Sequence, residues 1–242
     1  MLDRGETCLI GVISVTFILS MESTIKEQLC FNSEMEIELG PLSERETYAL
    51  LTQTILPRPI AWALTDNSLD GDAQWNLAPF SFFNGISSEP PMVMFSIGSW
   101  DVSGRVKDTL LNLRKKPDFT IGISNQKLIK QVQQSAVELD HGVSEVSHFS
   151  VATKIWDWPT PLIADCKINF ACTIAKEVKI DESSQILVFA RITKIWVADE
   201  AVSKDEKDRL VIDPMIVDPL LRLGAGKYGS LGAVIPQPSS DA

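Results

Sequence analysis

The sequence contains few of the residues that build metal and redox sites. Four of its 242 residues are cysteines, and no two of them form a Cys-x-x-Cys pair. The two histidines, His141 and His148, are too few and too separated to form a metal site by themselves. We therefore expect buried, reduced thiols and no resident metal. No nucleophile–base pair or pair of carboxylates is apparent, so no catalytic residue is predicted.

Excess positive charge is also lacking. The chain has 22 Lys and Arg against 32 Asp and Glu, which gives a net charge of −10 and a pI of about 4.7. This balance argues against a nucleic-acid surface. A hydrophobic fraction of 45% with 22% charged residues is ordinary for a protein that buries a core.

A long apolar run is the third absence. The stretch from Cys8 to Leu19 has 12 residues, which is too short to span a bilayer. As a signal peptide it is poor, because Asp3 and Glu6 offset Arg4. We interpret residues 1–34 as an N-terminal extension, disordered or ahead of the true start, and a targeting segment as the alternative. No membrane partner and a cytoplasmic location are expected.

Regular patterns begin near Pro41. A capping box formed by Ser43 and Glu46 predicts a helix that ends before Pro57. Further helices are predicted over 107–116 and 126–139. Strands are predicted over 59–65, 76–86 (one strand or a pair), 92–97, 119–124, 166–180 and 186–198, the last two as a hairpin.

Short strands joined by short links indicate antiparallel pairing, because parallel strands need long crossover connections. The sequence therefore predicts a mainly β (α+β) domain over residues 35–232, barrel-like and with a few peripheral helices. Residues 233–242, rich in Pro and Ser, are expected to form a disordered tail.

The segment 224–229, GAGKYG, matches the dinucleotide-binding pattern G-x-G-x-x-G. That pattern works only between a strand and a helix, with an acidic residue about 20 positions further on. Only 13 residues follow here, and they include Pro236 and Pro238. We interpret the match as chance.

Two stretches suit a ligand that combines a phosphate with an aromatic ring. Lys107, Asp108 and Thr109 open a predicted helix, where backbone N–H groups and the dipole favour an anion. An ordinary cap by Asp108 or Thr109 is the alternative. The segment 76–84, NLAPFSFFN, offers amides and a hydroxyl among aromatic rings. A core strand filled with aromatic side chains is the simpler interpretation of that segment taken alone.

Four motifs in order carry a family resemblance: PRPIAW (57–62), NLAPFSFFNGISSEPP (76–91), VMFSIG (93–98) and KDTLLNL (107–113). Together they resemble the flavin reductase-like, FMN-binding split-barrel proteins, and especially the flavoredoxin-like and flavoprotein oxygenase subgroup. The resemblance covers roughly residues 40–230. It implies a six-stranded antiparallel split barrel that forms homodimers and holds FMN near the subunit interface.

The resemblance also implies which residues hold the flavin. The flavin would be lined by Asn76, Ala78, Ser81, Phe82 and Asn84. The ribityl phosphate would be held by Ser96, Lys107, Asp108 and Thr109.

The implied function is that of an FMN-dependent oxidoreductase with NAD(P)H as a possible electron donor. Related reductase components carry a late Gly-Asp-His motif, whereas the matching segment here, VFARI (188–192), has no histidine. A flavin-binding carrier or sensor without turnover is therefore an alternative. A barrel that has lost its ligand is another, which the intact Asn, Ser and KDT positions argue against.

Overall fold

The computed structural model describes residues 35–68, 74–98, 105–140 and 143–238. The chain divides into two compact units, 1–47 and 48–242, and the boundary falls within helix α2 (Glu44–Thr54). The extension predicted for residues 1–34 lies outside the described residues, as does the end of the predicted tail.

The second unit is built on one antiparallel sheet in the order β2-β1-β5-β8-β9-β4-β3. Its strands are β1 (Ala61–Asp66), β2 (Trp75–Phe80), β3 (Phe83–Ser88), β4 (Pro91–Gly98), β5 (Asp118–Ile123), β8 (Ile168–Lys179) and β9 (Gln185–Val197). Every neighbouring pair is antiparallel, as the short links predicted.

The sheet has seven strands, one more than expected, because the run 76–86 is divided between two strands. Only Ser81 and Phe82 separate β2 from β3, yet these strands occupy opposite ends of the strand order. The sheet must therefore curl until its two edges approach each other. Among the described strands, no ladder joins β2 to β3, so the barrel stays split along this line.

Two apolar clusters pack on the two sides of β1, which explains why this strand is almost wholly buried. Ala61 belongs to one cluster, whereas Trp62 and Leu64 belong to the other. The first cluster is centred on residues of β4, β5 and β9: Phe95, Ile97, Phe119, Ile121 and Val188. The second lies under the helices and includes Leu77, Leu128, Val132 and Ile163.

The two described cysteines, Cys166 and Cys172, are free and fully buried. Burial raises the pKa of both thiols, which keeps them protonated and unreactive.

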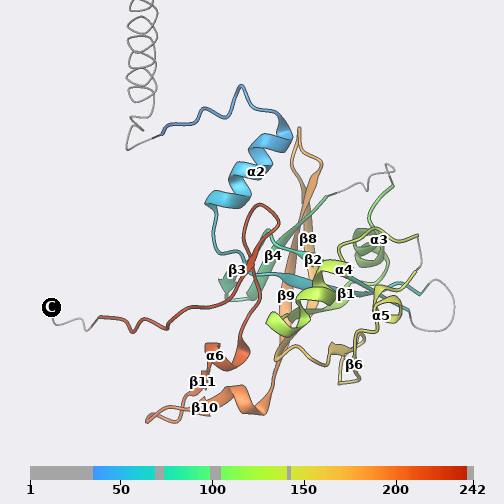
Figure 1. Cartoon of the computed structure of the whole chain (residues 1–242). Coiled ribbons are helices and arrows are strands. Elements are labelled where there is room, and N and C mark those ends of the chain that lie inside the picture. The colour runs from blue at the N-terminus through green and yellow to red at the C-terminus, as the bar shows by residue number, and fades with distance from the viewer. Residues whose placement is uncertain (1–34, 69–73, 99–104, 141–142, 239–242) are drawn as a thin grey trace, which may run out of the picture. The chain divides into compact units, whose positions relative to one another are not determined.

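Short helices gather beside β1 and β2 (Figure 1). They are α3 (Asp108–Lys115), the 3₁₀ turn η1 (Gln126–Leu128), α4 (Ile129–Gln134) and α5 (Glu145–His148). The helix predicted over 126–139 is shorter than expected. It ends where Ser135 accepts a hydrogen bond from the indole Nε1 of Trp62 (2.8 Å) and donates one to the carbonyl of Val132 (3.1 Å).

The predicted capping box is present at the start of α2. The carboxylate of Glu46 accepts a hydrogen bond from the backbone N–H of Ser43 (2.9 Å), and the Ser43 hydroxyl accepts one from the Glu46 N–H (3.3 Å). Satisfying these donors fixes where the helix begins.

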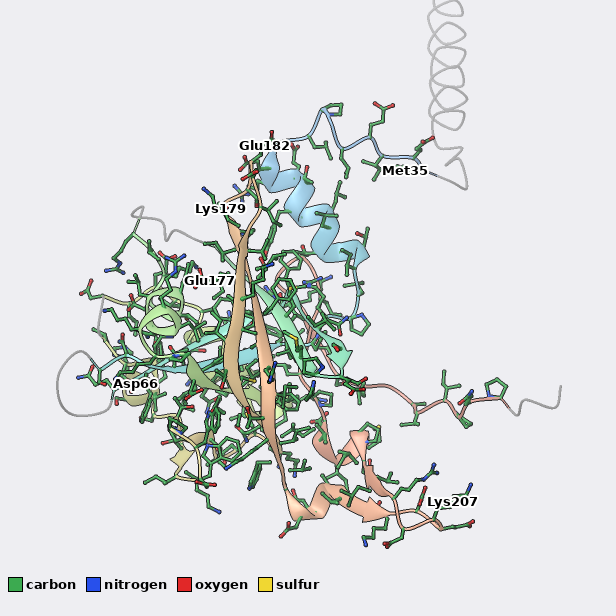
Figure 2. All side chains as sticks on the ribbon, turned by 180° about the vertical axis from the view of Figure 1, so that it is seen from behind. Met35, Asp66, Glu177, Lys179, Glu182 and Lys207 are labelled. Atoms are coloured by element: carbon green, nitrogen blue, oxygen red, sulfur yellow. The ribbon has the colours of Figure 1, made fainter. Side chains whose placement is uncertain are left out.

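The hairpin β8–β9 is the longest feature of the sheet. Figure 2 shows Glu177 and Lys179 on β8 near Glu182, which lies in the turn at the hairpin tip. The smaller elements are β6 (Thr153–Lys154), β7 (Leu162–Ile163), η2 (Asp199–Ala201), β10 (Val202–Lys204), β11 (Leu210–Ile212), α6 (Pro214–Val217), β12 (Leu221–Arg222) and β13 (Tyr228–Gly229).

Gly224, the first glycine of the GAGKYG segment, has a packing role. A Cβ at this position would lie 2.8 Å from the carbonyl oxygen of Thr52 and 2.9 Å from the Cα of Gln53. The glycine therefore lets the backbone pass directly over the end of α2. Among the described residues, no helix follows it to form a dinucleotide-binding turn, so the match to G-x-G-x-x-G has no functional meaning.

None of the helices in the described part of the chain has both the length and the apolar character needed to cross a membrane.

Candidate functional site

A pocket of about 290 Å³ lies where β2, the start of α3 and the segment after α4 meet. Five of the nine residues predicted to bind a ligand line it: Asn76, Ala78, Lys107, Asp108 and Thr109. The structure thus brings the first part of the stretch 76–84 together with residues 107–109. Others in the lining are Phe80, Arg105, Ser135, Glu138, Leu139 and Glu145.

Asn76 and Thr109 connect the two walls of this pocket. Both residues are 2% exposed, and the amide Nδ2 of Asn76 donates a hydrogen bond of 3.0 Å to the hydroxyl of Thr109. A buried amide without a partner is costly, so this bond fixes β2 relative to α3. The Thr109 hydroxyl retains its own proton for donation to another acceptor.

The start of α3 carries no side-chain cap within the described structure. Lys107 is the N-cap residue, and its side chain makes no capping hydrogen bond. The alternative of an ordinary cap by Asp108 or Thr109 is therefore wrong. The first backbone N–H groups of a helix seek acceptors and the dipole there is positive, so an anion is favoured at this end.

Two basic side chains stand at the pocket. The ammonium group of Lys107 lies 3.6 Å from the carboxylate of Glu138, and both side chains are about one third exposed. The guanidinium of Arg105 donates a hydrogen bond of 3.2 Å to the carbonyl of Leu139. Exposed ion pairs of this kind contribute little to stability, so Lys107 can exchange its partner for a ligand at small cost.

Glu145 is the buried acid of the site. It is 8% exposed, and its Oε2 accepts a hydrogen bond of 3.0 Å from the backbone N–H of Leu77. Burial raises the pKa of Glu145 to about 7; the hydrogen bond from Leu77 opposes this shift, and the negative charge of Asp108 adds to it.

The neighbouring Ser144 fastens the same short helix to the same strand. Its hydroxyl donates to the carbonyl of Trp75 (2.7 Å) and accepts from the N–H of Ser147 (3.2 Å). Because β2 ends the sheet order, its outer edge needs partners. Ser144 and Glu145 supply them with side chains instead of a strand.

The other four predicted residues lie outside this pocket. Ser81 and Phe82 form the bend between β2 and β3, with the Phe82 ring 6.2 Å from that of Tyr48. Asn84 accepts a hydrogen bond from the N–H of Gly85 (2.9 Å), and Ser96 donates one to the side chain of Gln185 (2.9 Å).

Strand register places these residues on one face. Phe83 pairs with the fully buried Phe95 on the core side, so Asn84, which pairs with Met94, points outward. Ser96 alternates with Phe95 and shares that outer face of β3 and β4. The nine residues therefore form two groups, one at the pocket and one around the bend and the outer face.

A larger cavity of about 910 Å³ lies elsewhere, between η1, α4 and the base of the β8–β9 hairpin. None of the nine predicted residues lines it. Of its charged groups, Lys167 is already paired with Glu200. We place the candidate site at the smaller pocket because that is where an uncapped helix start, a hydroxyl and basic groups converge.

A curled antiparallel sheet with unjoined edges defines a split barrel, and comparison with known proteins agrees. The family model of the flavin reductase like domain matches residues 53–224, which is more than half of the 242 residues. The chain belongs to this family, so the resemblance found in the four motifs is confirmed.

Individual relatives support the same assignment. The uncharacterized protein YwrF of Bacillus subtilis is 31% identical over 198 residues, which are 79% of this chain and 92% of that protein. Nitrilotriacetate monooxygenase component B from Bacillus cereus superposes with a TM-score of 0.73 at 25% identity, covering 85% of this chain and 100% of that chain.

A protein from Shewanella frigidimarina with a split barrel domain gives a TM-score of 0.72 at 16% identity, covering 86% of this chain and 100% of that chain. At this identity the likeness concerns the fold alone, and it confirms the predicted split barrel.

Proposed function

We propose that the protein is an FMN-binding oxidoreductase of the flavin reductase-like type, with NAD(P)H as electron donor. One observation carries the proposal: in a chain of this family, Lys107, Thr109 and the start of α3, which the N-cap side chain of Lys107 does not cap, meet at one pocket. A phosphate needs hydrogen-bond donors and positive potential, and this pocket supplies both. The residues present therefore fit the phosphate end of FMN.

The flavin ring would lie outside this pocket, toward the bend that follows β2. Phe80 lines the pocket, and Ser81 and Phe82 come directly after it in the bend. A ligand held by its phosphate at Lys107 can run past Ala78 toward this bend. There, backbone groups and the outer face that carries Asn84 are available to the ring. Ser96, which the resemblance assigned to the phosphate, lies on that outer face and not in the pocket, so it has no phosphate contact in this proposal.

The chemistry supplied by bound FMN is electron transfer from a reduced nicotinamide to free flavin, oxygen or a partner protein. The protein's own residues would hold FMN and orient it. Asn76 and Thr109 fix the two walls of the pocket, and Lys107 neutralises the phosphate. No described side chain is assigned a proton transfer to substrate.

We further propose that a second copy of the chain covers the outer face of β3 and the apolar side of α2. Tyr48 on α2 (58% exposed), Ile55 directly after this helix (54%) and Ile86 on β3 (45%) leave large apolar side chains exposed to solvent. Exposed apolar faces of this kind mark interaction surfaces. A partner there would also enclose the group around Asn84 and Ser96.

Replacing Ile86 with lysine should therefore convert a dimer into a monomer and weaken FMN binding, because a charge would be buried in the interface. Light scattering coupled to gel filtration measures the mass. Val234→Lys, at a residue that is 60% exposed in the segment after β13, is the matched control and should stay dimeric. A wild-type protein that is monomeric at all concentrations would contradict the proposal.

Purified full-length protein should bind FMN and gain the visible absorbance band of a flavoprotein. NADH or NADPH should then bleach this band under anaerobic conditions. A preparation that stays colourless with added FMN would refute the proposed function. A yellow protein that neither nicotinamide bleaches would support the second candidate, a carrier or sensor, which the absence of histidine from segment 188–192 favours.

A further inference from the structure

The phosphate pocket contains an acid that the proposed function leaves without a role. Among the described lining residues, the basic groups are Arg105 and Lys107, and the acidic groups are Asp108, Glu138 and Glu145. Fully ionised, these five side chains sum to a charge of −1. A phosphate dianion would enter against that charge, so the pocket suits it better when one of these acids is neutral.

Glu145 is the acid best placed to be neutral. Glu138 is paired with Lys107, and Asp108 stands at the start of α3. Glu145 is 8% exposed, and its carboxyl group accepts hydrogen bonds from uncharged backbone N–H groups, that of Leu77 and its own. Charge is costly in such a setting unless it is paired, and protonation removes that cost.

Protonation also changes what Glu145 offers to a ligand. An ionised carboxylate only accepts hydrogen bonds, as do the oxygens of a phosphate dianion. A protonated carboxyl group can accept from Leu77 at one oxygen and donate from the other. The same residue can therefore fasten β2 and present a donor to the pocket.

We propose that Glu145 is a positioning residue of the phosphate pocket, which holds β2 through Leu77 and takes up one proton from solvent when the phosphate of FMN binds. The inference rests on the proposed function. On release of FMN the proton returns to solvent, so binding and protonation are linked in both directions.

The surrounding groups are compatible with this assignment. Strand β2, which packs against α5, carries no titratable side chain in its sequence WNLAPF. Among the residues that the structure describes, the charged groups that line the pocket beside Glu145 are Arg105, Lys107, Asp108 and Glu138, and of these Asp108 raises the pKa of Glu145. On α5 itself the other titratable group is His148, whose ring packs edge-on against Phe149 at 4.7 Å.

The affinity of the wild-type protein for FMN should therefore fall above pH 7, by up to about tenfold per pH unit. Riboflavin, which lacks the phosphate, should show no such dependence. Calorimetric titration at about pH 8 in two buffers of different ionisation enthalpy should reveal close to one proton taken up per FMN and close to none per riboflavin.

Glu145→Gln keeps an oxygen for the Leu77 N–H and cannot titrate, so it should bind FMN without proton uptake and with a flat pH profile. Glu206→Gln, at an exposed position in the turn after β10 and away from the pocket, is the matched control and should retain the uptake. FMN binding without proton uptake in the wild type, or equal uptake in Glu145→Gln, would overturn the inference alone. The wild-type measurement decides even where the variant does not fold. Absence of FMN binding at every pH would overturn the proposed function and this inference with it.

Discussion

Replacing Lys107 with alanine should weaken FMN binding by about 30- to 150-fold and leave riboflavin binding almost unchanged. A charge-assisted hydrogen bond to a phosphate contributes about 2–3 kcal/mol, and 1.4 kcal/mol corresponds to tenfold in affinity. Lys107 stands at the uncapped start of α3, where the phosphate is assigned. Fluorescence titration with the two flavins measures both dissociation constants.

Lys115→Ala is the control, because it removes the same charge from the opposite end of α3. It should leave both affinities unchanged. Equal losses for FMN and riboflavin in Lys107→Ala would show that Lys107 supports the pocket in general and does not contact the phosphate. Lower salt should tighten FMN in the wild type more than in Lys107→Ala, since the Lys107 side chain is partly exposed.

The structure shows why Thr109 should not be changed in the same experiment. Its hydroxyl accepts the hydrogen bond from the buried amide of Asn76. Thr109→Val would leave that amide without an acceptor and cost about 1–3 kcal/mol of stability. A loss of FMN binding would then have two causes, so Lys107 alone gives the clean test.

Most of the sheet could be predicted because its strands follow local rules. Along β4, buried Val93, Phe95 and Ile97 alternate with less buried neighbours, which is the period of two that the sequence displays. The hairpin β8–β9 was visible from two long apolar runs around a polar turn. Sequence alone could not show that the bend at Ser81 and Phe82 carries the chain across to the opposite edge of the sheet.

The error in predicting the helix over 126–139 has a tertiary cause. The apolar spacing over 126–139 predicted one long helix, but Ser135 turns from the helix to the indole of Trp62, 73 positions earlier in the chain. Tyr48 on α2 and Ile55, the residue after this helix, are apolar and yet mostly exposed. A hydrophobic pattern shows which face of a helix is apolar. It does not show whether residues of the same chain or of another chain pack against that face.

The part of the candidate site that could be predicted is formed by residues close together in the sequence, at the start of α3. A helix start with Lys107 and Thr109 indicates an anion site or an ordinary cap, and the family resemblance favours the anion site. Glu145 gave no such signal, because its importance comes from burial against β2, 68 positions away from its partner Leu77. The sequence pattern next to Glu145, with Ser144 ahead of a short helix, indicates only a helix cap.

Glu145 also makes a prediction about stability in the absence of any ligand. Its pKa is about 7 in the folded protein against 4.5 for the unfolded chain. The folded state therefore binds this proton more tightly. The protonated Glu145 carboxyl group makes its full contribution to the free energy of unfolding below pH 4.5. This contribution is lost as the pH rises to about 7, because Glu145 ionises only in the unfolded state in that interval. At 1.36 kcal/mol per pKa unit, the full loss is about 3 kcal/mol.

Urea unfolding of ligand-free wild type and Glu145→Gln at about pH 5 and about pH 7.5 tests this, since most of the loss falls between those values. The wild type should lose about 2 kcal/mol more than the variant over this range. Carboxylates with lowered pKa, such as Asp66, act in the opposite direction but are common to both proteins and cancel in the comparison. Glu206→Gln, at an exposed position in the turn after β10, should behave like the wild type. If wild type and Glu145→Gln lose stability in parallel, Glu145 is ionised throughout and the pocket keeps its full negative charge.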